Sequence, residues 1–107
     1  MAKKNVQTNF NEEALRGSTL SLVQFKTDWK GTCQIVAMIY NDLAKSYNGT
    51  ANFFTIDFET EILLVNKYGV RDVPTILFYK NGKLIDHVVG LISKNVLIAK
   101  IENALSN

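Results

Sequence analysis

The segment from residue 28 to residue 34 holds the side chains best suited to chemistry. It contains Cys33, the single cysteine of the chain, three residues after Lys30. Backbone N–H groups at the amino end of a helix favour negative charge, so a cysteine placed there has a stabilised thiolate. The Lys30 ammonium, one turn away, could add a second positive neighbour. Cys33 is therefore a candidate reactive thiol, although a free cysteine more often packs as a small buried apolar residue.

A strand and a long helix are expected to hold this segment. The apolar run from Leu20 to Phe25 predicts a buried strand before it. After it, apolar residues recur at helical spacing up to the stop signal Asn48-Gly49, namely Val36, Ile39, Leu43 and Tyr47. Ligand crevices of α/β proteins tend to lie at the carboxyl ends of strands, so this position favours a functional site.

Two further helices and one strand are predicted in the first two thirds of the chain. A short helix is expected from Asn9, its candidate N-cap, to Leu15, with Gly17 after its end. The aromatic and β-branched run from Phe53 to Phe58 predicts a strand. A shorter helix is expected from Thr60 to Tyr68, ended by Gly69. Its inward residues are predicted to be Ile62, Leu64 and Val65.

The last third predicts a hairpin and a closing helix. Pro74 opens a strand over Thr75–Tyr79, and Asn81-Gly82 is typical of a type I′ turn. Leu84 to Val89 is the return strand, on which His87 is expected to be partly exposed, on the same side as Ile85 and Val89. Ser93 is a suitable N-cap for a helix whose inner stripe is Leu97, Ile101 and Ala104.

This order of elements predicts an α/β protein with a mixed central sheet and helices on both faces. The 107 residues fit one domain, residues 1–107, and 47% of them are hydrophobic, as in an ordinary globular chain. Residues 1–8 are polar and expected to be loose. No apolar segment follows Lys3-Lys4, so no signal peptide is predicted. No membrane span is predicted either.

Composition excludes several classes of function. One cysteine permits no internal disulfide, so the chain cannot run a dithiol–disulfide cycle alone. One cysteine and one histidine exclude a cysteine-rich zinc centre, and we expect no metal and no cofactor. A net charge of +2 gives no argument for nucleic acid or for an anionic membrane as a partner. The absence of a disulfide framework fits a reducing compartment, and we expect the protein to be cytoplasmic.

Several stretches, taken in order, resemble the thioredoxin family over nearly the whole chain. Val23–Trp29 resembles its central strand and active-site tryptophan, and Trp29–Cys33 falls where the family carries Trp-Cys-Gly-Pro-Cys. Tyr68–Thr75 resembles its Tyr-Gly-Val-x-x-x-Pro-Thr stretch. Further matches are Asp57 after the next strand, the hairpin Phe78–Gly82 and Gly90. The resemblance implies the thioredoxin fold and a cis peptide bond before Pro74.

The same resemblance shows where the chain departs from the family. Lys30 replaces the attacking cysteine, Thr32 replaces the motif proline, and Gln24 replaces a buried carboxylate that accepts a proton. Cys33 then stands at the position of the resolving cysteine. A glutamine side chain cannot act as a base near neutral pH. The reductase mechanism of the family therefore cannot operate, whereas a mixed disulfide with a partner protein or glutathione remains possible.

The resemblance also implies a groove for an extended peptide. A residue before proline is held in extended geometry, so Val73 is expected to present its backbone N–H and C=O outward. In the family this segment pairs with a substrate peptide. The residues predicted to line the groove are Trp29, Lys30, Gly31, Thr32, Val73 and Pro74.

Two functions remain open at this point. The first is thiol–disulfide redox chemistry limited to mixed disulfides through Cys33. The second is a non-catalytic module that binds an extended segment of a partner protein. A third, a 2Fe–2S cluster held by Cys33 from two chains with glutathione, has little support because such clusters need four ligands. The depth at which Cys33 is buried decides between the first two.

Overall fold

The computed structural model describes residues 6–106, and its elements follow the predicted order. In chain order they are β1 (Val6–Gln7), the 3-10 helix η1 (Glu12–Arg16), β2 (Leu20–Lys26), α1 (Gly31–Ser46), β3 (Ala51–Asp57), α2 (Ile62–Tyr68), β4 (Thr75–Lys80), β5 (Lys83–Val89) and α3 (Lys94–Ser106). None of the helices within these residues has the length and apolar character needed to cross a membrane.

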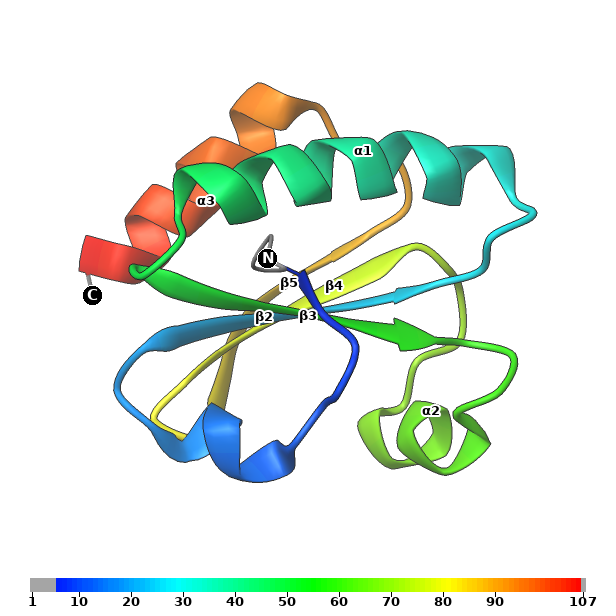
Figure 1. Cartoon of the computed structure of the whole chain (residues 1–107), viewed down its shortest axis with the longest axis horizontal. Coiled ribbons are helices and arrows are strands. Elements are labelled where there is room, and N and C mark those ends of the chain that lie inside the picture. Colours follow the sequence, from blue (N-terminus) through cyan, green and yellow to red (C-terminus); the bar gives the residue numbers. More distant parts are fainter. Residues whose placement is uncertain (1–5, 107) are drawn as a thin grey trace, which may run out of the picture.

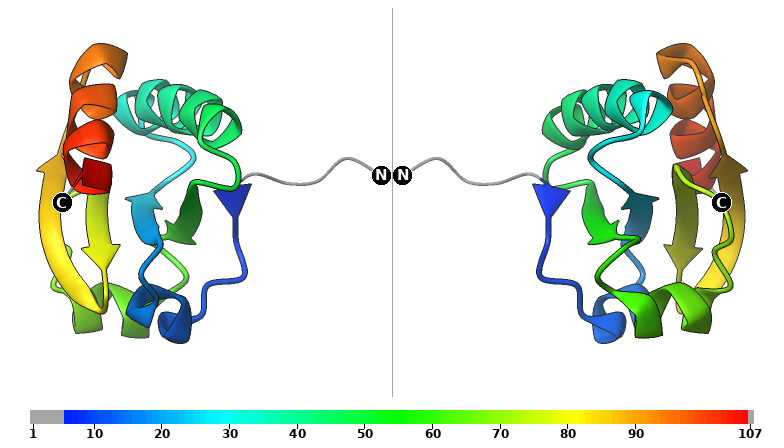
Figure 2. Two further views of the ribbon diagram at one scale, coloured as in Figure 1. Left: turned by 90° about the vertical axis from the view of Figure 1, so that its left-hand side faces the viewer. Right: turned by 90° about the vertical axis from the view of Figure 1, so that its right-hand side faces the viewer.

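The five strands form one mixed sheet in the order β1-β3-β2-β4-β5. Strands β1 and β2 pair with β3 in parallel, whereas β4 pairs antiparallel with both β2 and β5. Figure 1 shows α1 and α3 on one face of the sheet, and η1 and α2 on the other. The two side views of Figure 2 show the same layering. The predicted mixed α/β architecture is confirmed.

Two apolar clusters lie on the two sides of the sheet. The first joins the sheet to α1 and α3, and it includes Tyr40, Leu43, Leu97 and Ile101. The second joins the sheet to η1 and α2, and it includes Leu15, Phe25, Val65 and Val73. Cys33, although it lies on α1, belongs to the second cluster. The start of α1 is thus fixed to the core at the carboxyl end of β2.

The amino-terminal region differs from its prediction. Val6 and Gln7, expected to be loose, pair with Phe53 and Phe54 of β3. Two residues are too short a run for periodicity to reveal a strand. The N-cap of η1 is Asn11 instead of Asn9, because the Asn11 side chain accepts a hydrogen bond from the Glu13 amide at 3.0 Å. Residues 1–5 of the stretch expected to be loose lie outside the described residues.

Helix α2 turns a different face inward from the one predicted. Val65 is buried and Leu64 and Tyr68 are half-buried, but the side chain of Ile62 is 62% exposed. At about 100° per residue, Ile62 lies roughly a third of a turn from the centre of that inward stripe. It is also the first residue of the helix, where the sheet no longer covers it.

The hairpin turn has the backbone expected of its sequence. Asn81 and Gly82 both have positive φ, at 55° and 75°, which is the geometry of a type I′ turn. The pairing of β4 with β5 shifts between Phe78 and Tyr79. Because of this shift, the exposed His87 lines a surface hollow with Leu84 and Val89 and not with Ile85. The alternation expected for an unbroken strand is therefore wrong at Ile85.

Candidate binding site around Lys30 and Pro74

Two segments that are distant in sequence meet at the candidate site. One is the turn before α1, where Lys30 is the N-cap residue with extended backbone. The other is the loop before β4, where the peptide bond between Val73 and Pro74 is cis. The Lys30 Nζ atom donates a hydrogen bond to the Val73 carbonyl at 2.8 Å. The Lys30 side chain, which the resemblance places where the family has its attacking cysteine, is thus bound to the backbone that was predicted to hold a peptide.

The end of β5 forms the third side of this site. The Gly90 amide donates to the Pro74 carbonyl at 2.8 Å, and Val89 pairs with Thr75. Val73 and Pro74 are themselves buried. Val89 and Leu91, on either side of Gly90, are exposed, with Leu91 at 63%. The apolar contact surface at this point therefore comes from the end of β5 and not from the proline ring.

Trp29 directly precedes Lys30 at the site, and its described hydrogen bond is made by the indole nitrogen. Its indole Nε1 donates to the Glu59 carboxylate at 3.0 Å, and the Glu59 amide donates to Asp57 Oδ1 at 2.8 Å. The Trp29 side chain is nevertheless 70% exposed. An exposed indole with a fixed polar end resembles the aromatic anchors of protein interfaces.

The thiol of Cys33 points into the core. Its side chain is 0% exposed and packs in the cluster of Phe25, Val70 and Val73. Its polar contact among the described residues is with Thr27, whose Oγ1 lies 3.8 Å from Sγ. A partner sulfur has no open path to this atom in the folded chain. This depth of burial favours a structural role for Cys33, and hence the binding module over mixed-disulfide chemistry.

Gln24 occupies the core beneath the site without full hydrogen bonding. It is completely buried, and its Oε1 accepts a hydrogen bond from Thr55 Oγ1 at 3.3 Å. Its Nε2 finds no partner among the described residues. A neutral amide cannot take up the proton of Cys33.

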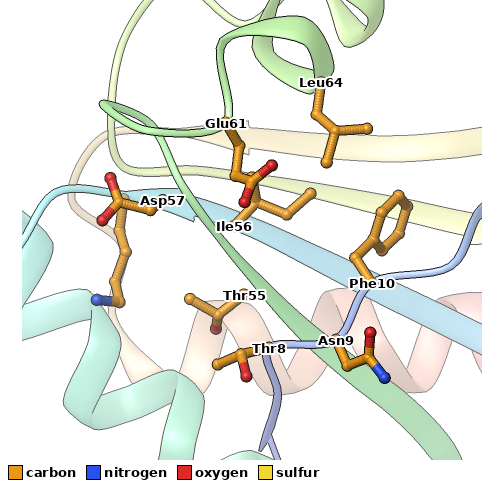
Figure 3. Close-up of a pocket in the computed structure, with 9 residues that line it drawn as sticks. Thr8, Asn9, Phe10, Thr55, Ile56, Asp57, Glu61 and Leu64 are labelled. Atoms are coloured by element: carbon orange, nitrogen blue, oxygen red, sulfur yellow. The ribbon is translucent and has the colours of Figure 1, made fainter.

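Two hollows flank the site. One, of about 370 Å³, lies beside the ends of β1 and β3, where Figure 3 shows Asp57 and Glu61 across from Phe10. The other, of about 330 Å³, lies between the end of α2 and β5 and begins at Arg71 and Asp72. Among the described residues, no group of His, Cys, Asp and Glu is placed to hold a metal ion.

Charge near the turn is largely paired. Lys26 and Asp28 form an ion pair, and the hydrogen bond from Lys26, together with its charge, holds the pKa of Asp28 below its ordinary value. Glu59 is engaged by Trp29. The Gln34 side chain donates to the Asp28 carbonyl at 2.8 Å and so fixes the turn to the first turn of α1.

Comparison with known proteins accounts for this arrangement. The family model of thioredoxin matches residues 1–103. The chain belongs to the thioredoxin family. It is 32% identical to thioredoxin 2 of Chlorobaculum tepidum, over 88% of this chain and 86% of that protein. It is 31% identical to a thioredoxin of Rickettsia bellii, over 96% of this chain and 98% of that protein.

Two further comparisons bear on length and on fold. A chloroplastic thioredoxin M-type of Pisum sativum is 35% identical over 89% of this chain, and the chain spans 55% of that protein's length. The crystal structure of a Malassezia sympodialis thioredoxin matches with a TM-score of 0.81 at 23% identity, covering 94% of this chain and 89% of that chain. The thioredoxin fold expected from the sequence is therefore confirmed.

The predicted site residues fall into two groups in this thioredoxin-family chain. Trp29, Lys30, Val73 and Pro74 come together, and Gly31 and Thr32 begin α1 beside them. Cys33 stands apart, since its side chain turns into the core.

Three residues of the site were not predicted from the sequence: Glu59, Val89 and Leu91. The signal for Leu91 was an apolar residue after the strand-ending Gly90, outside any periodic pattern. No comparable signal marked Glu59, whose contact with Trp29 spans 30 residues.

Proposed function

We propose that this chain is a thioredoxin-fold binding module that holds an extended segment of a partner protein beside the Val73–Pro74 loop. The observation that carries the proposal is the contrast between Cys33, which is 0% exposed, and Trp29, which is 70% exposed. The accessible surface offers contact area, and the thiol is withdrawn from it. No cofactor is part of the proposal, and a cytoplasmic, reducing setting fits a chain with one buried thiol.

The exposed surface suits an extended peptide. Trp29 directly precedes Lys30 and Leu91 directly follows Gly90, the two residues that bond to the Val73–Pro74 loop, and both of these apolar side chains are exposed. Aromatic and aliphatic anchors around a central backbone contact are typical of peptide-binding edges, where main-chain hydrogen bonds give affinity and side chains give specificity. Solvent-exposed Val89 extends the same apolar rim along the end of β5.

The second candidate is thiol–disulfide redox chemistry through Cys33, and membership of the thioredoxin family supports it. In this reaction the Cys33 thiolate would attack a partner disulfide, one new S–S bond would form, and the second partner sulfur would leave as a thiolate. The chain holds no second cysteine to resolve the product. The reaction also requires residues 28–33 to open, because Sγ lies in the core.

Two measurements on the full chain separate the candidates. A phage-displayed library of random peptides is panned against the wild-type protein, and the selected peptides are measured by fluorescence anisotropy. Trp29→Ala is expected to weaken their binding at least tenfold, about 1.4 kcal/mol, because hot-spot aromatics carry such energies. Cys33→Ala should leave the affinity within about twofold, because that side chain does not reach the surface. Met38→Ala, an exposed change on α1, is the matched control.

The thiol is tested on the same samples by intact mass after exposure to oxidised glutathione. The binding proposal expects no adduct in the folded chain and a full adduct after denaturation. A rapid adduct on the folded chain, together with selected peptides that ignore Trp29→Ala, would overturn the proposal in favour of mixed-disulfide chemistry.

A further inference from the structure

Lys30 is placed unlike the four lysines that form described ion pairs, and like Lys80 it donates to a backbone carbonyl. Lys26, Lys67, Lys94 and Lys100 each pair with a carboxylate, respectively from Asp28, Glu12, Asp42 and Asp86. Lys30 is half-buried, and its Nζ atom meets the Val73 carbonyl instead. Within residues 6–106, no carboxylate lies within ion-pair distance of it. This ammonium is therefore partly withdrawn from water and has no counter-charge among the described residues.

The Lys30 ammonium has N–H donors that are not used in its described hydrogen bond. An ammonium carries three N–H donors, and one of them is used on the Val73 carbonyl. A charge taken partly out of water is stabilised by an opposite charge and by satisfied donors. Asp28 pairs with Lys26, Glu59 accepts from Trp29, and neither forms a described ion pair with Lys30. An incoming ligand is the remaining source of a carboxylate.

The Val73 carbonyl fixes where that ligand would lie. A carbonyl oxygen has two lone pairs, so it can accept from Lys30 and from a backbone N–H of a bound segment together. A segment paired there would lie next to the Lys30 Nζ atom, which bonds to the same carbonyl. Arg71, two residues before Val73, is exposed and adds positive charge at the rim, while the exposed Asp72 makes no ion pair with Lys30.

We infer that Lys30 is a specificity residue that receives a carboxylate of the bound segment next to the residue paired with Val73. The inference rests on the proposed binding function and adds the chemistry of the partner: an extended segment with an acidic group at that point. The position that would hold a nucleophilic sulfur in a dithiol relative is then a receptor for negative charge. The carboxylate has two possible sources, an acidic side chain or a free carboxyl terminus.

The test uses the peptides selected from the library on the full chain. Each acidic residue of a selected peptide is changed to its amide, and each peptide is made with a free and with an amidated carboxyl terminus. On the wild-type chain, one such change is expected to weaken binding about tenfold, which corresponds to about 1.4 kcal/mol. On Lys30→Met the same change should have no effect, so that the double-mutant cycle assigns the interaction to Lys30.

Lys45→Met provides the control, because Lys45 is exposed on α1 and forms part of its last turn, far from Val73. It should retain the full preference for the acid. The decisive carboxylate is identified by the peptide change that weakens binding to the wild-type chain but has no effect on Lys30→Met. That change is either in an acidic side chain or at the carboxyl terminus.

Two other outcomes would overturn the inference, and they differ in what else they remove. Selected peptides that need Trp29 but show no acid preference, or keep it on Lys30→Met, would refute the role of Lys30 and leave the binding function intact. A pool with no peptide that depends on Trp29 would refute both.

Discussion

The turn before α1 and the loop before β4 lie against each other, but different kinds of interaction hold them. The loop is held mainly by backbone, through the Gly90 amide on the Pro74 carbonyl and the pairing of Thr75 with Val89, with one side-chain hydrogen bond from the Thr75 hydroxyl to the Asp72 carbonyl. The turn is held by side chains, through Lys30 on Val73, Gln34 on the Asp28 carbonyl and Trp29 on Glu59. Side-chain interactions depend on residue type, whereas backbone hydrogen bonds do not.

This difference explains which half of the site departs from the thioredoxin pattern. Substitutions at Lys30, Thr32 and Gln24 change the chemistry of the turn without breaking a strand pairing or a backbone hydrogen bond of the loop. The fold can therefore keep a binding surface while it loses a reaction, because the two are supported by separate sets of contacts. The following changes test that separation, beginning with the largest expected effect.

Gln24→Glu places a carboxyl group in the core beneath the turn. Burial disfavours the charged form, so the folded-state pKa of the new group lies above the unfolded value of about 4.3. The variant should therefore lose stability as pH rises above that value, by about 3 kcal/mol at neutral pH. Urea unfolding at pH 4 and pH 7 measures this loss.

Gln24→Leu is the matched control for that change. It removes the unpaired Nε2 and also the Oε1 that accepts from Thr55 Oγ1, and we expect a change in the free energy of unfolding within about 1 kcal/mol. An equal loss for both variants would show that shape, and not charge, governs this position.

Cys33→Ser tests whether the thiol acts as a core residue. A hydroxyl of nearly the same size would be buried with Thr27 as its one polar neighbour, so we expect a loss of about 1–3 kcal/mol in the free energy of unfolding. Peptide affinity should not change. The midpoint of urea unfolding measures the loss, and Met38→Ser on the exposed face of α1 is the control. Unchanged stability would mean that Cys33 is not packed as described.

Leu91→Ser tests the loop side. Because Leu91 is exposed, the change should leave the free energy of unfolding within about 0.5 kcal/mol. Removal of an apolar contact at the rim should weaken the selected peptides about fivefold. Leu63→Ser, on the exposed face of α2, should alter neither quantity. Equal effects of Leu91→Ser and Leu63→Ser on affinity would show that the end of β5 takes no part in binding.

The smallest change in stability is expected at the ion pair between Asp86 of β5 and Lys100 of α3. Burial raises the pKa of Asp86. The hydrogen bonds from the Lys100 ammonium and the His87 amide, with the Lys100 charge, lower it by more than burial raises it, so the pKa lies below its ordinary value. Such a group contributes stability above the unfolded pKa of about 3.9, and this contribution is lost as pH falls through the folded value.

Asp86→Asn should therefore reduce the free energy of unfolding at pH 7 by at most about 1 kcal/mol. The difference in the free energy of unfolding between Asp86→Asn and wild type should vanish in strong acid. Urea unfolding at pH 7 and in strong acid measures it. A difference that persists in acid would assign the effect to packing and not to charge.

The sequence predicted the fold because its signals are local. Hydrophobic periodicity marked α1 and α3, and Asn81-Gly82 marked the hairpin, each within a few residues. Ser93 was correctly predicted as a cap, since its Oγ accepts from the Val96 amide at 3.2 Å. The prediction failed where a residue's surroundings come from elsewhere in the chain, as for Ile62 at the start of α2.

Most residues of the site could be predicted from the sequence, but the contacts between them could not. Trp29 and Pro74 could be proposed from the family resemblance, yet the contact of Lys30 with Val73 joins residues 43 apart in sequence. The orientation of Cys33 also depends on tertiary packing, because the first turn of a helix presents residues both to solvent and to the core. No pattern in residues 28–34 distinguishes these two orientations.

The contact between Lys30 and Val73 also determines which conditions in solution the surface responds to. A dithiol at this point would change its chemistry with the reduction potential of the surroundings. An ammonium bound to a carbonyl is the same under oxidising and reducing conditions, and dissolved ions screen its attraction for an anion over roughly 8 Å at physiological salt. Ionic strength, and not redox state, is therefore the variable that should tune this face of the molecule.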